Sequence, residues 1–211
     1  MNLLLFGKPG AGKGTQAPRV AEALGVPTLA TGDVLRNAQR EGTALGLKAT
    51  AFMERGDLVP DEVILGIVGE TLAKADYARG VVLDGVVRTV PQAEGLDRVL
   101  AGLKRRLDAV LQFDIDSDDI VRRLSGRTVC GKCQTPYTGR EPGSACDKCG
   151  GVLVRRKDDD PDAVRNRLTV YEKQTAPVLE WYERHGARVV TVSAVGDVAE
   201  VTTRALKALG R

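Results

Sequence analysis

The chain has 211 residues, of which 43% are apolar and 28% are charged, and it carries a formal net charge of +3. This composition is typical of a globular protein with one main core, so we expect one main domain with insertions. So small a net charge does not indicate a nucleic-acid partner, and no apolar stretch approaches the roughly 18 residues of a membrane span. We therefore expect a cytoplasmic protein without nucleic-acid or membrane partners, and a monomer is the default.

The first apolar run, Leu3–Phe6, is followed at once by residues 7–15, which read Gly-Lys-Pro-Gly-Ala-Gly-Lys-Gly-Thr. Four apolar residues are too few for a signal peptide. The pattern G-x-x-x-x-G-K between a strand and a helix start is typical of a loop that binds polyphosphate. Its glycines let backbone N–H groups approach phosphate oxygens, and Lys13 adds a mobile cation. An ordinary glycine-rich turn is the alternative, but the lysine and the spacing favour a nucleoside triphosphate.

Gly14 occupies the position where many phosphate loops carry a Ser or Thr that ligates magnesium, and Thr15 comes one place later. Without that hydroxyl, we expect Mg²⁺ to be held by phosphate oxygens and water, with a carboxylate oriented behind it. Asp84 is the candidate, because it ends the apolar run Val81–Leu83 at the expected carboxyl edge of a parallel sheet.

Strand-like apolar runs alternate with helical stretches, which predicts a parallel α/β sheet. The expected strands are Leu3–Phe6, Thr28–Ala30, Val81–Leu83, Val110–Phe113 and Val189–Val192. The expected helices are Gly12–Leu24, Val34–Gln39, Leu45–Glu54, Asp61–Lys74, Pro91–Leu103, Asp118–Leu124, Pro161–Arg184 and Val198–Leu209. We predict a phosphate-loop (P-loop) fold of class α/β, with a five-stranded parallel sheet flanked by helices.

Two stretches interrupt this alternation. Residues 31–59 are helical but rich in Gly and charge, and they predict a small inserted lobe between the second and third strands. Residues 127–157 have no helix pattern and contain four cysteines, so they predict a second insert. The main domain would then consist of residues 1–30, 60–126 and 158–211.

The cysteines form two C-x-x-C pairs with 12 residues (134–145) between them, and they are Cys130, Cys133, Cys146 and Cys149. This spacing is typical of a zinc ribbon, in which two pairs of thiolates complete a tetrahedral site. Four thiolates leave no coordination position open for a catalytic water, so we expect a structural Zn²⁺. Another thiophilic metal such as iron is the alternative. The metal would replace a core that so short a segment cannot form alone. Disulfides are not favoured in a chain without an export signal.

Arginines at loop ends and beside the cysteines form another pattern, and they are Arg36, Arg88, Arg123, Arg127, Arg156 and Arg167. Any one of them alone is as well explained as a solvated surface charge. As a set they indicate phosphoryl transfer between two anionic substrates, because guanidinium groups neutralise charge on both without needing a proton.

Five ordered motifs carry a resemblance to a known family, and they are residues 7–16, Thr31–Arg36, Gly56–Asp61, Asp84–Gln92 and Arg156–Asp159. The chain resembles the adenylate kinase family, in its long form with a zinc-binding lid, over essentially its whole length. This resemblance implies that residues 31–59 bind the nucleoside monophosphate (NMP) and that residues 127–157 form the lid. It also implies reversible transfer of a phosphoryl group from Mg·ATP to AMP, giving two ADP. A kinase of UMP, CMP or GMP is the alternative.

The resemblance also implies roles for single residues. ATP would be bound by Gly10, Ala11, Gly12, Lys13, Gly14, Thr15, Arg123 and Arg127. AMP would be bound by Thr31, Arg36, Leu58, Val59, Gly85, Arg88, Gln92, Arg156 and Arg167, with Thr31 and Gln92 near the base. The catalytic set would be Lys13, Asp84, Arg88, Arg123, Arg156 and Arg167, with Asp84 orienting the water shell of Mg²⁺. Asp158 and Asp159 would position the lid arginines or bound water.

Val86-Val87 departs from the family, which usually has Phe-Pro after Asp-Gly. Proline would rigidify the turn that leads to Arg88, sometimes through a cis bond. We therefore expect either a rearranged turn with trans bonds or a slower enzyme, in which Arg88 is less well held. Restoring Phe and Pro should improve turnover or the KM for AMP.

Two other classes of function are less favoured. A nucleic-acid-binding knuckle would place Lys132, Arg140 and Lys148 on phosphates, but Tyr137 is the only aromatic residue of the insert that could stack on a base. A regulatory nucleotide binder would keep the phosphate loop but would not need Arg88, Arg156 and Arg167, all of which are present. No side chain needs to act as a nucleophile, and we expect His185, the only histidine, to lie at the surface.

Overall fold

The computed structural model describes residues 1–211, apart from the side chain of residue 45. Five parallel strands form its main sheet in the order β2-β3-β1-β4-β8. They are β1 (Asn2–Phe6), β2 (Thr28–Ala30), β3 (Val81–Asp84), β4 (Ala109–Asp114) and β8 (Val189–Ser193). Each expected strand is present, and no bound differs from the prediction by more than one residue. The predicted fold class is confirmed.

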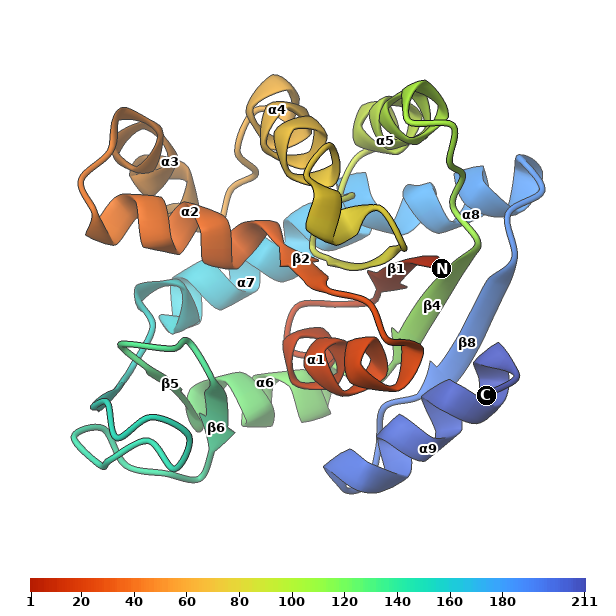
Figure 1. Ribbon diagram of the computed structural model, residues 1–211. Coiled ribbons are helices and arrows are strands. Elements are labelled where there is room, and N and C mark those ends of the chain that lie inside the picture. The colour runs from red at the N-terminus through yellow and green to blue at the C-terminus, as the bar shows by residue number, and fades with distance from the viewer.

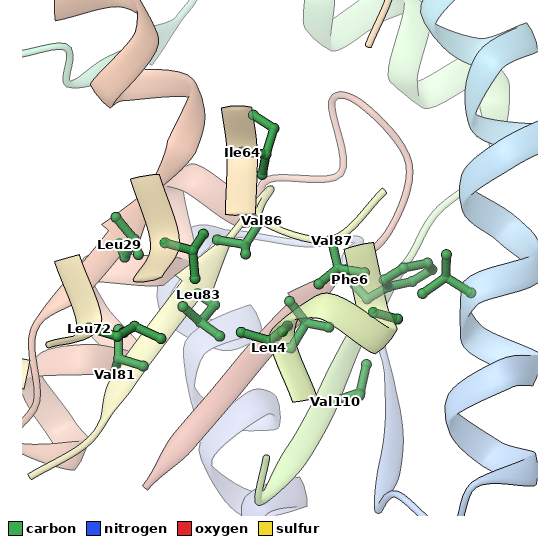
Figure 2. Packing of buried hydrophobic residues seen from close by; sticks show 14 of the residues in the cluster. Leu4, Phe6, Leu29, Ile64, Leu72, Val81, Leu83, Val86, Val87 and Val110 are labelled. Carbon is green, nitrogen blue, oxygen red and sulfur yellow. The ribbon is translucent and has the colours of Figure 1, made fainter. Parts of the chain in front are cut away.

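Helices cover both faces of this sheet (Figure 1). On one face lie α4 (Asp61–Leu72), α5 (Val90–Gly102) and α8 (Ala176–Arg184). Leu4 and Phe6 of β1 point into the core beneath them, where Figure 2 shows these side chains among valines and leucines of the neighbouring strands.

On the other face lie α1 (Lys13–Leu24), α6 (Ser117–Ser125) and α9 (Val198–Leu209). Here Leu3 and Leu5 enter a second core. Successive residues of a strand point to opposite faces, so a parallel strand covered on both sides is apolar at nearly every position, as Leu3–Phe6 of β1 are. The sheet therefore holds the loop after β1 on a rigid, doubly packed strand.

Two helices, α2 (Thr31–Arg40) and α3 (Ala44–Arg55), lie between β2 and α4. The first of them begins three residues before the expected Val34, because the chain passes from β2 into the helix without a turn. Gly32 and Asp33 are weak helix formers, so the sequence favours a later start, but an acidic side chain in the first turn is favourable beside the helix dipole.

The long helix expected over Pro161–Arg184 is interrupted. The chain forms α7 (Pro161–Val170), then a π-helical turn η3 (Tyr171–Thr175), and then α8. In this turn the N–H of Ala176 bonds to the carbonyl of Tyr171 five residues earlier. Pro177 follows and has no N–H to continue the regular ladder, which is a common cause of such a break. The prediction of one uninterrupted α-helix was wrong at this turn.

The cysteine region forms a separate antiparallel sheet in the order β6-β5-β7, below α7 in Figure 1. Its strands are β5 (Arg127–Cys130), β6 (Pro136–Thr138) and β7 (Leu153–Val154). Short 3₁₀ turns, η1 (Ala75–Tyr77) and η2 (Lys157–Asp159), complete the assignment.

In the part of the chain that the structure describes, every helix is too short or too polar to cross a membrane. His185 is exposed, as expected, and stacks on Trp181.

Candidate functional site

The loop between β1 and α1 is shaped by glycine. Gly12 precedes the helix with φ +92°, a left-handed conformation that L side chains rarely adopt. The ammonium of Lys13, the next residue, donates to the carbonyls of Gly7 at 2.6 Å and Lys8 at 3.0 Å. Burial lowers the pKa of Lys13 to about 8, although Asp84 opposes the shift. The lysine is therefore a poorly hydrated cation held across the mouth of the loop.

A cleft of about 640 Å³ opens above this loop, which is within the range of nucleotide-sized ligand sites. A smaller pocket of about 60 Å³ shares part of its lining. The larger cleft is lined by these predicted site residues: Gly10, Ala11, Gly12, Lys13, Gly14, Thr15, Arg36, Leu58, Asp84, Gly85, Arg88, Arg123, Arg127, Arg156 and Arg167. The smaller pocket adds Thr31, Val59 and Gln92. The fold thus brings every predicted nucleotide-site residue to one of two adjoining pockets.

Three arginines on one side of the cleft are paired with two aspartates. Arg127 donates to the carboxylate of Asp159 at 2.7 Å, and Arg156 donates to that of Asp158 at 2.8 Å. Arg167 contacts both carboxylates, at 3.2 and 3.4 Å. All five side chains are only 6–16% exposed. Three cations against two anions leave a net positive charge, held in fixed directions, beside the cleft.

The arginines also control the ionisation of this cluster. Burial alone would raise the pKa of Asp158, but Arg156 and Arg167 hold it well below its usual range. For Arg167, loss of hydration lowers the pKa to about 10, with Asp158 opposing the shift. Asp158 therefore stays ionised and keeps the guanidinium groups aligned when no phosphate is present.

Arg88 follows a tight turn after β3 and lines both pockets. Gly85 has φ +66°, and its carbonyl accepts from the hydroxyl of Thr31 at 2.8 Å and from Nε of Arg88 at 3.3 Å. Val86 and Val87 are buried in the core shown in Figure 2, and no described peptide bond is cis. Of the two outcomes expected for this turn, the trans arrangement is the one observed. The benefit of restoring Phe and Pro stays a prediction.

Gln92 lines the smaller pocket, yet both ends of its amide are engaged. Its oxygen accepts from the backbone N–H of Arg88 at 2.7 Å, and its nitrogen donates to Asp61 at 2.7 Å. The amide oxygen therefore supports the Arg88 turn, and contact with a base would fall to the remaining amide hydrogen.

Sequence reasoning missed some of the cleft lining. Asp33 pairs with Arg36, and the carbonyl of Ala194 accepts from Arg123 at 2.8 Å. Ala194, Gly196 and Val198 line the cleft just after β8. The rule that ligands bind at the carboxyl ends of parallel strands could have identified this last segment.

The four cysteines converge as predicted, and their sulfurs all lie within 4.8 Å of one another. The Sγ–Sγ distances are 3.5 Å for Cys130–Cys149 and 3.6 Å for Cys133–Cys146. A tetrahedral ion with Zn–S bonds of about 2.3 Å needs sulfurs about 3.8 Å apart, so the cluster fits such an ion. Backbone N–H groups of Lys132 and Cys133 also point at the Cys130 sulfur, as they would toward a thiolate.

Two carboxylates, Asp33 and Asp84, line the cleft beside the phosphate loop. Burial raises the pKa of Asp84, and Lys13 opposes the shift. A Cβ at Gly14 would lie only 3.4 Å from the Asp84 carboxylate, so glycine leaves the space between them open. Oxygen ligands in such a space fit a hydrated Mg²⁺ ion that accompanies a nucleotide.

A phosphate loop on a five-stranded parallel sheet, facing arginines across a nucleotide-sized cleft, defines a phosphotransferase that acts on nucleotides. The adenylate kinase family model matches residues 5–187. The chain is 58% identical to an adenylate kinase of Gemmatimonas aurantiaca over 99% of both chains, and 50% identical to one of a Geobacillus species over 88% of both. An adenylate kinase of Methanocella arvoryzae is 44% identical over 96% of this chain and 95% of its own. The chain belongs to the adenylate kinase family, which confirms the resemblance and the predicted class of enzyme.

Proposed function

We propose that this chain catalyses reversible, Mg²⁺-dependent transfer of the γ-phosphoryl group of ATP to AMP, giving two ADP. The observation that carries the proposal is the convergence of six guanidinium groups and one phosphate loop on a single cleft. Charge must be neutralised on the donor, on the acceptor and on the group in transit, and this arrangement supplies cations to all three.

ATP occupies the side of the cleft that contains the phosphate loop. The loop amides and Lys13 bind its β- and γ-phosphates, as the dipole of α1 favours. Arg123, anchored on the carbonyl of Ala194, lies against the adenine, and Arg127 lies near the phosphates. The aligned position of Arg127 is maintained by Asp159.

AMP occupies the side formed by the Arg88 turn and the smaller pocket. Arg36 and Arg88 bind its phosphate, and Thr31 and Gln92 lie beside the base. The backbone around Leu58 and Val59 lines the adenine. The two nucleotides then meet with their phosphates between Lys13 and the lid arginines.

An oxygen of the AMP phosphate forms a bond to the γ-phosphorus while the bond to the β–γ bridging oxygen breaks. The AMP phosphate is already ionised near neutral pH, so no side chain has to remove a proton. Arg88, Arg156 and Arg167 hold the acceptor and the transferred group in line, and Lys13 stabilises charge on the departing ADP. Asp84 would orient the water shell of Mg²⁺, which would supply charge neutralisation to the phosphates of ATP.

We propose that residues 31–59 and 127–157 act as two covers on a core made of residues 1–30, 60–126 and 158–211. Closed covers exclude water, which would otherwise hydrolyse ATP. Structural Zn²⁺ on the four cysteines holds the second cover together, because the segment has little core of its own. We propose that the enzyme works as a monomer, because one chain supplies every group named here. We propose the cytoplasm as its location.

A coupled assay tests the proposal directly. ADP formation is measured from ATP with AMP, CMP, UMP or GMP as acceptor, with and without Mg²⁺. We expect rapid ADP formation with AMP and Mg²⁺ only, and a loss of activity of about 10²–10³-fold in Lys13→Met. Faster turnover with another acceptor would assign a different monophosphate kinase, and equal hydrolysis of ATP without any acceptor would contradict phosphoryl transfer.

A further inference from the structure

The backbone of Arg88 is fixed on both sides by side chains. Its N–H donates to the amide oxygen of Gln92 at 2.7 Å, and its carbonyl accepts from the hydroxyl of Thr175 at 2.8 Å. Gln92 lies on the helix that follows the turn, whereas Thr175 comes from a segment 87 residues further along the chain.

Thr175 reaches the turn because it ends the π-helical turn η3. The hydrogen bond from Ala176 to Tyr171 widens the helix at this point, and such local widening is frequent at functional sites. Thr175 is buried, with 7% of its surface exposed, and it lines the main cleft. The same turn contacts the phosphate loop, since Glu172 pairs with Lys8 at 3.4 Å.

The other contacts of the turn hold the residues before Arg88 and leave the Arg88 peptide itself free: Thr31 donates to the Gly85 carbonyl, and Val86 and Val87 are buried in the core. Residues 84–89 contain no proline, and Gly85 has the conformational freedom of a residue without Cβ. Arg88 lines both pockets, and its Nε donates to the carbonyl of Gly85 at 3.3 Å, which is long for a hydrogen bond. The direction of the side chain therefore depends on the orientation of the Arg88 backbone.

We propose that Thr175 is a positioning residue that orients Arg88 toward the phosphate of AMP. The inference rests on the proposed function, in which Arg88 binds that phosphate. Loss of the hydroxyl leaves the Arg88 carbonyl without this partner and allows the peptide to rotate, so the guanidinium loses its alignment. Because Thr175 does not contact ATP in this scheme, its removal weakens AMP binding selectively.

The test compares Thr175→Val, which keeps the shape of the side chain, with Thr175→Ser, which keeps the hydroxyl. Isothermal titration gives the dissociation constants for AMP and for ATP, and steady-state kinetics gives KM and kcat. We expect Thr175→Val to weaken AMP binding by about 3–10-fold, the usual effect of one hydrogen bond, with ATP binding within about twofold of the parent. Thr175→Ser should retain near-parental AMP binding. Melting curves confirm the fold, and Thr175→Ala replaces the valine variant if that variant does not fold.

A double-mutant cycle with Arg88→Ala shows whether Thr175 acts through Arg88. Once Arg88 has been truncated, Thr175→Val should cause no further loss of AMP affinity. An equal loss in both backgrounds, a parallel loss of ATP affinity, or no loss in the single variant overturns the inference while Arg88 keeps its role. If Arg88→Ala itself leaves AMP affinity unchanged, the assigned role of Arg88 is wrong and this inference is overturned with it.

Discussion

Arg40, at the end of α2, donates a hydrogen bond to the carbonyl of Gly131 in the first cysteine turn. These residues lie on the two segments that we propose as covers, so the contact joins one cover directly to the other. A second tie links α3 to the end of the cysteine region, where Lys157 pairs with Glu54 at 2.7 Å. Both ties are exposed, and each contributes at most about 1 kcal/mol.

Arg40→Ala should shift the enzyme toward an open state. We expect KM for ATP and for AMP to rise together by about 2–5-fold, the effect of losing up to 1 kcal/mol, without a fall in kcat. Steady-state kinetics and single-molecule distance measurements between α2 and the cysteine region provide the readout. Lys48→Ala, an exposed change on the neighbouring helix, is the matched control, and equal parameters in the two variants would show that the tie has no such role.

The ionisation of Asp158 predicts an acid-sensitive contribution to stability. Its pKa is held below the ordinary value of 3.8 in the folded protein, despite the opposing effect of burial. The contribution is therefore fully present above about pH 4 and is lost as pH falls through the lower, folded pKa. Asp158→Asn should lower the free energy of unfolding by up to about 3 kcal/mol near neutral pH, because Arg156 and Arg167 lose a buried partner.

Denaturant unfolding of Asp158→Asn and the parent protein, measured at several pH values, tests this assignment. The difference between the two proteins should narrow as pH falls below about 4, since protonation removes the same charge from the parent. Asp162→Asn, at an exposed ion pair on α7, should show no such difference. A constant difference between Asp158→Asn and the parent at all pH values would contradict an electrostatic origin.

Much of this site was predictable because its residues lie in short motifs with fixed local geometry. The phosphate loop, the Arg88 turn and the cysteine pairs each depend on neighbours within a few residues, and the parallel sheet brings the ends of β1 and β3 together. The six arginines were recognised as a set, from their positions at loop ends and beside the cysteines, and any one of them alone would have passed for a surface charge. Their shared cleft follows from the fold and is seen only in three dimensions.

The contacts that sequence reasoning missed join distant segments. Thr175 bonds to Arg88 only because the helix widens at η3, and a pattern of helical periodicity does not reveal a π turn. Similarly, Arg40 of the first insert contacts Gly131 of the second, and the sequence pattern of neither insert indicates this contact. The engagement of the Gln92 amide oxygen by the Arg88 N–H also depends on a backbone turn whose shape the two valines do not predict.

The cysteine cluster predicts a metal that stabilises the lid. Purified protein should contain one Zn²⁺ per chain by elemental analysis, and Cys133→Ser should lose most of it. Without the ion, the small cluster of Cys130, Cys146 and Leu153 is too small to hold the second sheet. We expect a lower Tm and faster proteolysis within residues 127–157, whereas Ser144→Ala should behave as the parent. Full metal content in Cys133→Ser would contradict a four-cysteine site.

The titration of Lys13 predicts the alkaline limb of the pH–rate profile. Burial places its pKa at about 8 in the free enzyme, well below 10.5. The value of kcat/KM for ATP reports on free enzyme, so it should fall as pH rises above about 8, where the neutral amine no longer attracts phosphate. Bound phosphates stabilise the ammonium, and the limb in kcat should therefore lie at higher pH.

Tyr171 also lines the cleft, but burial raises its pKa to about 12, which removes it from this range. Lys13→Met should be slower and lack the limb near pH 8. Persistence of that limb in the variant would assign the titration to another group.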